Sequence, residues 1–513
     1  MRSLNSIKNT IVSVIMSVVS VLITLIAQKI FLGTLGEEYL GLNGLFGDIL
    51  SVLAIAELGF GSAIIYSMYA PLKNNDTEEL KSLMKFYKNV YRIIALIVTV
   101  LGIALIPFLN ILVSETSIDV NLTFLYFLFL FDVIASYLLS YKRSILYANQ
   151  QTYIINLVHI AYLVLMNVTQ ISILLLTKNY IFYLVSKIGF RILENVVITI
   201  IANKKYPYIT EKNVKPLSIS TKNEIKQKIH GLIFHKIGAT GINSTDNMII
   251  SYFLGVAKVG LLTNYTTLTN GLNILITQIF SALTASVGNL LLENDKEKSY
   301  SIYKSILLLN FWIYSFAAIG LVCLFKPVII VWIGEKYLLS FSLLLALCIN
   351  FYFSGMKKTF ILFKDAAGIF YEDRYVPILE IIVNIVSSII LIHYFELTGV
   401  IIGTILSSLV VFLYSYPKFI YKPLFNGKYS TYLKEQGKYL LLFILTFILC
   451  ISIMQIIPFT NIWSEVLVGF AVAIIIPNSV YLLLFYKTDE FKYYISLLNV
   501  LKEAVMKKKE EEM

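Results

Sequence analysis

The sequence predicts an all-α integral membrane protein with about 14 transmembrane helices, arranged as two pseudo-symmetric six-helix lobes plus two C-terminal helices. Three observations support this prediction: long apolar segments recur along the 513 residues, positive charge falls on every second joint between them, and a short motif repeats. The composition agrees, since 58% of the residues are hydrophobic, 14% are charged and the mean hydropathy is +0.78. Soluble domains carry about 25% charged residues.

The apolar segments have the length that membrane helices need. About 20 apolar residues cross the roughly 30 Å hydrocarbon core as a helix, which satisfies its own backbone hydrogen bonds where water is absent. The predicted spans cover residues 11–32, 40–68, 90–113, 122–139, 154–176, 180–201, 231–253, 261–291, 306–325, 338–362, 376–394, 400–413, 439–454 and 466–485.

A repeated motif predicts how these spans are grouped. The sequence FLG at 31–33, followed by GL at 41–42, recurs as FLG at 253–255, followed by GL at 260–261. Six spans separate the copies, and an even number preserves orientation, so we expect a parallel repeat about an axis along the membrane normal. The predicted segments are an N-terminal lobe at 1–202, a cytoplasmic linker at 203–230, a second lobe at 231–420, a linker at 421–438, two extra helices at 439–486 and a cytoplasmic basic tail at 487–513.

The charge distribution predicts the orientation of the chain. About 34 of the 42 Lys and Arg residues fall on the side of the N-terminus, so the positive-inside rule places both termini in the cytoplasm. About four fall on the opposite side, namely Lys178, Lys258, Lys326 and Lys336. Topology therefore explains the net charge of +11, and we expect no nucleic-acid partner.

Signatures of enzymes and metal proteins are missing from the sequence. No Gly-rich phosphate loop ends in Lys-Ser or Lys-Thr, and the joints between spans are too short for a catalytic domain. Cys323, Cys348 and Cys450 lie inside apolar spans without metal-ligand spacing. We therefore expect no enzymatic activity, no cofactor and no metal site.

One predicted span carries a stripe of charge. Lys187, Arg191 and Glu194 fall at i, i+4 and i+7, on one helix face. Each charge at a helix centre costs about 2.5–3.5 kcal/mol on insertion scales unless a cavity or partner accepts it. Either Arg191 pairs with Glu194, or Lys187 and Arg191 bind a phosphate-bearing substrate, for which the planar Arg fork is suited. Lys236, in the next span, either joins this site or snorkels to the interface.

Two acidic residues are candidates for gating or ion coupling. Glu57 lies in the sequence ELGFG at 57–61, whose glycines permit a bend, and its alternative role is a structural hydrogen bond to neighbouring backbone. Asp246 is too short to snorkel and must face polar surroundings. The acidic residues with less support are Asp48, Asp132 and Glu380.

Several motifs resemble bacterial polysaccharide repeat-unit flippases, which act in O-antigen, capsule and exopolysaccharide synthesis. The segments LGEEYLGLNGLF at 35–46, ELGFGSAI at 57–64 and YAPL at 69–72 resemble the N-terminal region of that family, and residues 136–150 resemble its fourth-helix loop. The motif resemblance covers about the first 155 residues and the TDN sequence at 245–247.

The resemblance implies a flippase that moves undecaprenyl-pyrophosphate-linked oligosaccharide from the inner to the outer leaflet of the cytoplasmic membrane by alternating access. The family belongs to the multidrug, oligosaccharidyl-lipid and polysaccharide exporter superfamily. Implied partners are the lipid-linked substrate, membrane lipids, a polysaccharide polymerase and glycosyltransferases. Two alternatives stay open: a flippase for lipid-linked peptidoglycan precursor, and a multidrug or cation antiporter. The sequence leaves the sugars, the coupling ion and the oligomeric state open.

Overall fold

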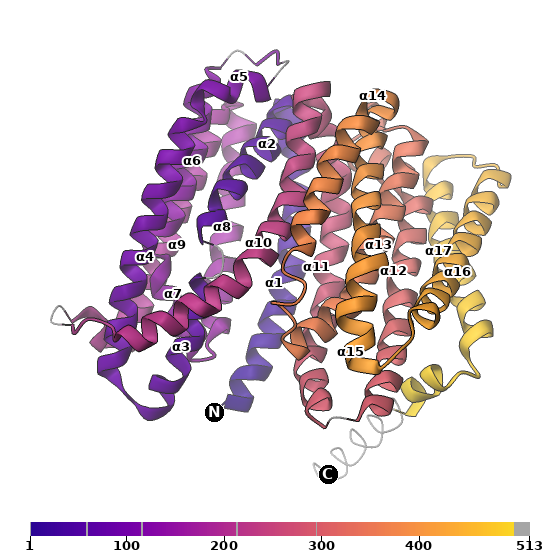
Figure 1. Ribbon diagram of the computed structural model, residues 1–513. Helices are drawn as coiled ribbons and strands as arrows, with labels where there is room; N and C mark the ends of the chain where they lie inside the picture. Colours follow the sequence, from indigo (N-terminus) through magenta and orange to yellow (C-terminus); the bar gives the residue numbers. More distant parts are fainter. Residues whose placement is uncertain are drawn as a thin grey trace, which may run out of the picture. The chain divides into compact units, whose positions relative to one another are not determined.

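The computed structural model is helical (Figure 1), and every regular element in its described part is a helix. It describes residues 2–57, 60–113, 116–118, 120–211, 214–293 and 295–496. Side chains are outside this description at 2–8, 10, 11, 55, 56, 62, 227–236, 238, 239, 242, 243 and 285. The prediction of an all-α membrane protein is therefore confirmed.

Contacts divide the chain into two compact units. Unit 1 comprises Met1–Gly271 and Pro377–Val400, and unit 2 comprises Leu272–Val376 and Ile401–Met513. The lobe boundaries expected from the sequence, at 202 and 231, stay predictions.

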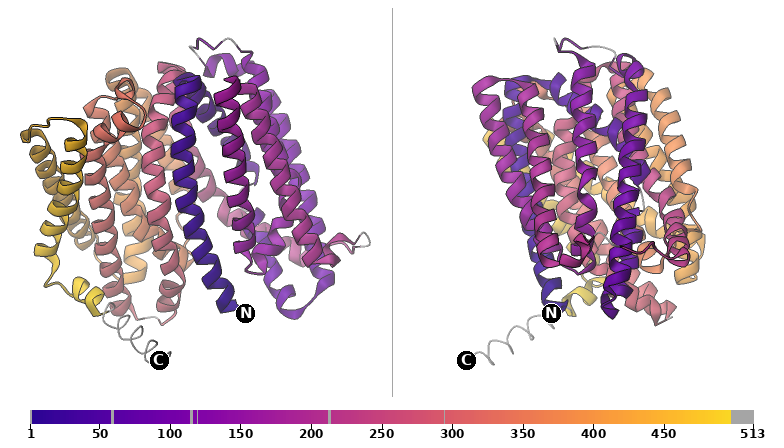
Figure 2. Two further views of the ribbon diagram at one scale, coloured as in Figure 1. Left: turned by 180° about the vertical axis from the view of Figure 1, so that it is seen from behind. Right: turned by 90° about the vertical axis from the view of Figure 1, so that its left-hand side faces the viewer.

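The first ten helices all belong to unit 1. They are α1 (Arg2–Leu35), α2 (Glu37–Leu53), α3 (Phe60–Asn74), α4 (Thr77–Ala104), α5 (Leu109–Leu112), α6 (Leu122–Leu138), α7 (Arg143–Ala148), α8 (Thr152–Thr177), α9 (Tyr180–Lys205) and α10 (Ile219–Leu254). Short 3-10 turns lie between them at Ala54–Glu57, Ile106–Phe108, Ser140–Lys142 and Pro207–Thr210. α1 packs along α8, and α8 packs along α9 (Figure 2).

The remaining helices include two that cross the division between the units, α11 and α14. The set is α11 (Val256–Leu292), α12 (Lys296–Trp332), α13 (Phe341–Ala367), α14 (Val376–Val410), α15 (Lys422–Phe425), α16 (Tyr429–Ile456) and α17 (Ile462–Phe485). A 3-10 turn covers Glu335–Tyr337, and a π-helical segment covers Val411–Tyr421.

The predicted spans fall on these helices, with three departures from simple rods. The span 90–113 covers the end of α4, the 3-10 turn Ile106–Phe108 and α5. Residues 40–68 form two helices, α2 and α3, because the 3-10 turn Ala54–Glu57 interrupts them. The span 376–394 lies in α14, which kinks where Glu396 has φ 48°. The span 400–413 runs from α14 into the π-helical segment Val411–Tyr421. Counted over the described residues, nine helices are long and apolar enough to cross a membrane, by length and composition.

Polar caps begin several of the long helices. In each, a side-chain oxygen accepts a hydrogen bond from a backbone N–H of the first turn that has no partner within the helix. These caps are Asp76 on α4, Asn121 on α6, Asn179 on α9, Ser218 on α10, Asp295 on α12 and Asn461 on α17. The starts of these helices are therefore set by local sequence as well as by hydrophobicity.

Two glycine joints in unit 1 repeat the same geometry. Gly36 separates α1 from α2 with φ 88°, and Gly255 separates α10 from α11 with φ 85°. Their N–H groups bond the carbonyls of Leu32 and Ser251, each at 3.1 Å. Glycine adopts this left-handed backbone without the steric cost that a Cβ imposes. Both joints are 219 residues apart (255 minus 36).

A second glycine pair brings the two copies into backbone contact. A Cβ added at Gly41 would overlap the carbonyl oxygen of Val256, and one added at Gly260 would overlap that of Glu37. The same spacing applies, since 260 minus 41 and 256 minus 37 both give 219. The first turns of α2 and α11 therefore touch reciprocally, as a pseudo-two-fold axis requires.

Side-chain hydrogen bonds follow the same symmetry. Thr267 Oγ1 donates to Gln28 Oε1 at 2.8 Å, and Asn247 Nδ2 donates to Asp48 Oδ2 at 2.5 Å. Adding 219 to a residue number in the first copy gives its equivalent in the second, so Gln28 is equivalent to Asn247 and Asp48 to Thr267. The two hydrogen bonds therefore join equivalent pairs of positions.

The structural symmetry confirms the alignment of the GL part of the repeated motif but changes the alignment of its FLG part. The structure aligns Gly41 with Gly260, as the motif does. It aligns Gly255 with Gly36 rather than with Gly33, because Gly255 and Gly36 share the left-handed joint between helices. The FLG match at 31–33 and 253–255 is therefore three residues out of register.

The glycine contact predicts an unusual response to a methyl group. We expect Gly41→Ala to destabilise the protein by about 1–3 kcal/mol, because the neighbouring backbone carbonyl cannot move aside as a side chain would. Gly47→Ala on the same helix is the matched control, since nothing lies within 4 Å of its added Cβ. Thermal unfolding in detergent, followed by tryptophan fluorescence, measures both. Equal melting temperatures for the two variants would contradict the backbone contact.

Candidate functional site

Helix α9 carries three charged residues within its apolar part, Lys187, Arg191 and the buried Glu194. Asn179 caps its start by accepting hydrogen bonds from the N–H groups of Ile181 and Phe182. The helix packs against α6 and α8, and α7 also contacts it. Charged residues on its inner faces therefore meet side chains from three other helices.

The first group, here the Asp132 cluster, joins α9 to α6. Lys187 Nζ lies 3.3 Å from Asp132 Oδ2, and Arg191 Nε lies 3.3 Å from Asp132 Oδ1. The Lys187 and Arg191 side chains remain 29% and 28% exposed, whereas that of Asp132 is 10% exposed. The Lys187 ammonium lies 5.3 Å from the ring centroid of Phe129, and the Arg191 guanidinium lies 5.9 Å from that of Tyr162. Two cations therefore share one carboxylate.

The second group, here the Glu194 cluster, lies further along α9. The Glu194 side chain is fully buried, and its Oε1 lies 3.3 Å from Arg143 Nη2 and 2.8 Å from His159 Nδ1. Arg143 Nη2 also donates to Asn195 Oδ1 at 2.8 Å. Asn195 in turn donates to the carbonyl of Ala135 on α6 at 3.1 Å. The cluster thus joins α6, α7, α8 and α9.

These geometries bear on one of the two interpretations of the α9 stripe, and phosphate binding by Lys187 and Arg191 stays a prediction. Arg191 bonds to Asp132, and Glu194 bonds to Arg143 and His159, so the expected Arg191–Glu194 ion pair is not the arrangement that the structure shows. Lys187 and Arg191 do lie together, as predicted. Counting only Lys and Arg as cations, the two clusters hold three cations and two carboxylates, which leaves one net positive charge.

Glu57 lies in a separate group of tyrosines. Tyr91 donates a short hydrogen bond to Glu57 Oε1, Tyr87 donates to Tyr91 at 3.0 Å, and Tyr137 also hydrogen-bonds Glu57. The bend predicted here is present, since Glu57 ends the 3-10 turn between α2 and α3. Leu58 and Gly59 lie outside the described residues. The partners of Glu57 that the described residues show are hydroxyl groups on α4 and α6, and both of its predicted roles stay open.

Asp246 has polar surroundings of its own. Asn384 Nδ2, on α14, donates to Asp246 Oδ1 at 3.2 Å, and Thr245 donates to Asn384 Oδ1 at 3.2 Å. The expectation that Asp246 faces polar groups therefore agrees with its contacts. The prediction for Lys236 falls outside the described residues, because its side chain is not among them.

Some partners in these clusters escape sequence reasoning. The sequence gives Asp132 less support as a functional residue than Glu57 or Asp246, because no nearby sequence pattern indicates that it pairs with residues of α9. Arg143 lies in a joint between two predicted spans, where the positive-inside rule predicts a cytoplasmic charge, although its guanidinium reaches the buried Glu194. His159 is one of four histidines in the chain and lies inside an apolar span, which is the signal that could have singled it out.

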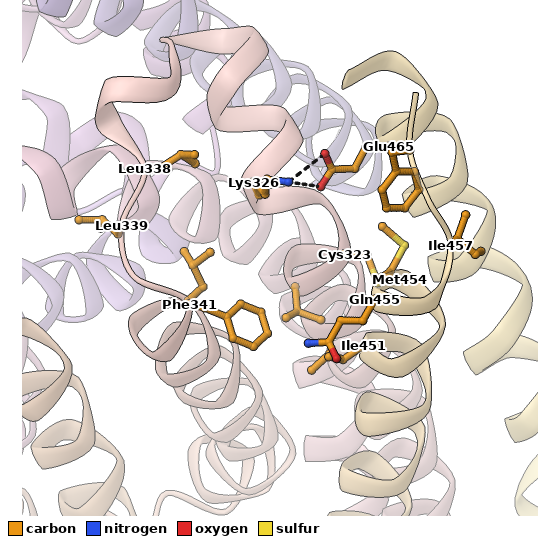
Figure 3. Close-up of a pocket in the computed structure, with 13 residues that line it drawn as sticks. Cys323, Lys326, Leu338, Leu339, Phe341, Ile451, Met454, Gln455, Ile457 and Glu465 are labelled. Atoms are coloured by element: carbon orange, nitrogen blue, oxygen red, sulfur yellow. Dashed lines mark hydrogen bonds and ion pairs between the residues drawn. The ribbon is translucent and has the colours of Figure 1, made fainter. Parts of the chain in front are cut away.

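Unit 2 has a cavity of about 390 Å³ between α12, α13, α16 and α17 (Figure 3). Lys326 Nζ reaches Glu465 across one wall at 3.0 Å, and the other labelled residues are mostly apolar (Figure 3). The single lysine of this lining is thus matched by a carboxylate, and the cavity offers less to an anion than α9 does.

A metal centre has no basis in the described part of the chain, where no group of three or more His, Cys, Asp or Glu side chains is arranged to hold an ion. The cysteines are consistent with this, since Cys323, Cys348 and Cys450 are buried and unpaired by disulfides.

Solved structures of membrane transporters share this fold. The chain is similar to the lipid II flippase MurJ in an inward closed conformation, with a TM-score of 0.64 and 16% identity over 92% of this chain and 99% of that chain. It is similar to an inward-facing MATE family multidrug resistance transporter of the MOP superfamily, with a TM-score of 0.59 and 18% identity over 80% of this chain and 98% of that chain.

A third similar structure is a mutant of the MATE transporter VcmN from Vibrio cholerae, with a TM-score of 0.58 and 15% identity over 86% of this chain and 99% of that chain. No family model and no curated protein matches the chain by sequence. At these identities the likeness establishes the fold alone.

The buried Glu194 cluster predicts a large loss of stability on charge removal. We expect Glu194→Gln to cost about 2–4 kcal/mol, because Arg143 would keep its charge in a partly buried site without a carboxylate. The control is Glu293→Gln, which removes a 2.6 Å ion pair with Lys298 whose side chains are both 53% exposed and should change the melting temperature little. A similar small shift for both variants would argue against the buried pair.

Proposed function

We propose that this protein is a flippase that translocates undecaprenyl-pyrophosphate-linked oligosaccharide repeat units from the inner to the outer leaflet of the bacterial cytoplasmic membrane. Its product serves surface polysaccharide synthesis, such as that of capsule, and its partners are a polysaccharide polymerase and glycosyltransferases. The proposal is supported by the cation excess at the Asp132 cluster, by the fold shared with a lipid II flippase, and by the N-terminal motif resemblance.

The Asp132 cluster carries the substrate part of the proposal. Lys187 and Arg191 share one carboxylate, and both side chains retain partial exposure. A pyrophosphate brings the negative charge that this pair lacks, and the guanidinium of Arg191 can donate two parallel hydrogen bonds to it. A neutral drug or a cation gains nothing from the same pair.

Asp132 has a definite role in this scheme. Without substrate, its carboxylate holds Lys187 and Arg191 in place and lowers the cost of keeping two cations among apolar helices. An arriving pyrophosphate competes with Asp132 for the same donors. Release is then assisted, because Asp132 recovers both contacts when the substrate leaves. This exchange keeps binding reversible, as transport requires.

Energy coupling is proposed at Glu57 and Asp246. Glu57 lies in the 3-10 turn between α2 and α3 and accepts a hydrogen bond from Tyr91 on α4. A change in the protonation of Glu57 would alter this hydrogen bond, and with it the packing of the turn against α4. Asp246 is linked through Asn384 to α14. Protonation or Na⁺ binding at these carboxylates would bias the alternating-access cycle.

The two alternatives differ in substrate. A flippase for lipid-linked peptidoglycan precursor would use the same cationic pair, and the shared fold with MurJ is compatible with it. A multidrug or cation antiporter would need acidic binding groups without Lys187 and Arg191 beside them. The motif resemblance favours the polysaccharide substrate over both.

The proposed substrate contact predicts a selective loss of transport. Arg191→Ala should reduce the flipping rate of a pyrophosphate-linked glycolipid in liposomes at least about tenfold, because the bidentate donor is lost. Arg191→Lys should recover only part of this rate, since a lysine keeps the charge without the fork. Arg374→Ala is the control, because Arg374 belongs to unit 2, where it stacks on Tyr371 and Tyr375, and it is not part of the Asp132 cluster. Unchanged flipping by correctly folded Arg191→Ala would remove the cationic site.

The coupling proposal predicts a different defect. Glu57→Gln keeps the size of the side chain and removes its charge, so we expect transport to lose its response to an imposed proton or Na⁺ gradient. Binding of substrate should persist, because Lys187 and Arg191 are intact. The measurement is the flipping rate in liposomes with and without each gradient, with Glu293→Gln as the charge-matched control. An undiminished response to the gradient would assign coupling elsewhere.

A further inference from the structure

We propose that unit 1 contains a second anion site, separate from the Asp132 cluster, which binds a phosphate group in a cavity where α4, α9 and the segment after α9 meet. The inference goes beyond the proposed function, because its residues take no part in the Asp132 or Glu194 clusters. The phosphate group belongs either to a soluble phosphate compound or to a lipid headgroup.

The cavity has a volume of about 470 Å³, within the range of ligand-binding pockets. It lies at the end of unit 1 that holds α3 and α7 (Figure 1), the end that the charge distribution predicts to be cytoplasmic. Its charged lining consists of Lys81, Lys85, Lys88, Lys142 and Glu211. Four cations face one carboxylate there.

Lys142 is the central observation. It is 5% exposed, and its ammonium donates to Asn203 Oδ1 at 2.8 Å and to the carbonyl of Ile209 at 3.3 Å. Both acceptors are neutral, and among the described residues no carboxylate pairs with it. A buried lysine usually has a counter-charge, because desolvation of an unpaired ammonium is costly. An anion in the cavity would supply it.

The carboxylate that lines the cavity is already engaged. Glu211 Oε2 lies 2.6 Å from Lys81 Nζ, which also contacts Glu78 at 2.7 Å. Lys81 is thus shared by two carboxylates, and Glu211 makes its ion pair with Lys81 rather than with Lys142. With Glu78 counted, the four lysines still exceed the carboxylates by two charges, and among the described residues no ion pair to a carboxylate involves Lys85, Lys88 or Lys142.

Lys85 and Lys88, the two remaining lysines of the cavity, are placed to bind the same anion as Lys142. Lys85 donates to the carbonyl of Val214 at 3.3 Å, again a neutral acceptor, and its side chain is exposed. Lys88 makes no hydrogen bond or ion pair to the described residues and lies near enough to Lys142 to repel its charge. An anion between these groups would remove that repulsion and accept hydrogen bonds from flexible ammonium donors.

The site also contacts the segment that joins α9 to α10. Lys142 donates to the carbonyl of Ile209, and Lys85 donates to that of Val214. Ser82 donates to the carbonyl of Lys215 at 2.9 Å. A bound phosphate would compete for the same lysines. Occupancy of the cavity would therefore change how firmly this segment is held against α4.

Lysine footprinting of the full-length protein tests the site directly. An amine-acylating reagent is applied in detergent with and without inorganic pyrophosphate, and mass spectrometry reads each lysine. We expect pyrophosphate to slow labelling of Lys85 by at least about fivefold, since the probe would occupy the cavity that Lys85 lines. Lys204 is the internal control, because it is exposed on α9 outside the cavity lining, and its labelling should not change.

Variants then show which lysines contribute to pyrophosphate binding, with protection of Lys85 from labelling as the measure of binding. Lys142→Gln should raise the pyrophosphate concentration for half-protection about tenfold, since a buried charge–phosphate contact is lost. Replacing a buried lysine can unfold a protein. Lys88→Gln therefore repeats the test at a residue that makes no hydrogen bond to the described residues, and about a threefold rise is expected. Lys204→Gln should leave the value unchanged.

A lipid arm distinguishes the two sources of phosphate. Nanodiscs of phosphatidylcholine are compared with nanodiscs that also contain phosphatidylglycerol. Protection of Lys85 by phosphatidylglycerol alone assigns a lipid headgroup, and protection by pyrophosphate alone assigns a soluble phosphate compound. Failure of both probes to protect Lys85, or equal protection of Lys204, overturns the proposal. Either result leaves the Arg191 test of flipping unaffected.

Discussion

Unit 1 depends on the backbone contact between Gly41 and Gly260. Helices in a membrane gain little from the hydrophobic effect among themselves, so close packing and hydrogen bonds must hold them together. The two glycines let the first turns of α2 and α11 meet without intervening side chains, and the joints at Gly36 and Gly255 aim those helices. The reciprocal Gln28–Thr267 and Asn247–Asp48 bonds then continue the same symmetry deeper along the helices.

Charge in the spans is managed by sharing partners across helices. α9 supplies residues to two clusters, and each reaches a different neighbour: Asp132 on α6, and Arg143 and His159 on α7 and α8. Pairing lowers the cost of each charge, but it does not bring the net charge to zero. The remaining positive charge distinguishes α9 from a helix whose polar residues serve packing alone, and it is the basis on which we propose an anionic substrate.

The sequence predicts the helical architecture well because each span is a local property of composition. Gly41 and Gly260 were found as a repeat for the same reason, since both copies keep a short local pattern. The register error at Gly33 arose because an FLG match does not contain the left-handed joint, which belongs to Gly36. The partners of Glu194 could not be predicted, because Arg143 and His159 come from other helices and only packing brings them to it. Lys142 was missed similarly, since its burial depends on the segment after α9.

The most direct test of the central claim is the pool of lipid-linked intermediates in a strain that lacks this gene. A flippase for repeat units predicts that complete oligosaccharide units on undecaprenyl pyrophosphate accumulate in the inner leaflet while surface polymer disappears. Their composition would identify the sugars. Normal surface polysaccharide, together with altered sensitivity to cationic compounds, would contradict the claim and favour an antiporter.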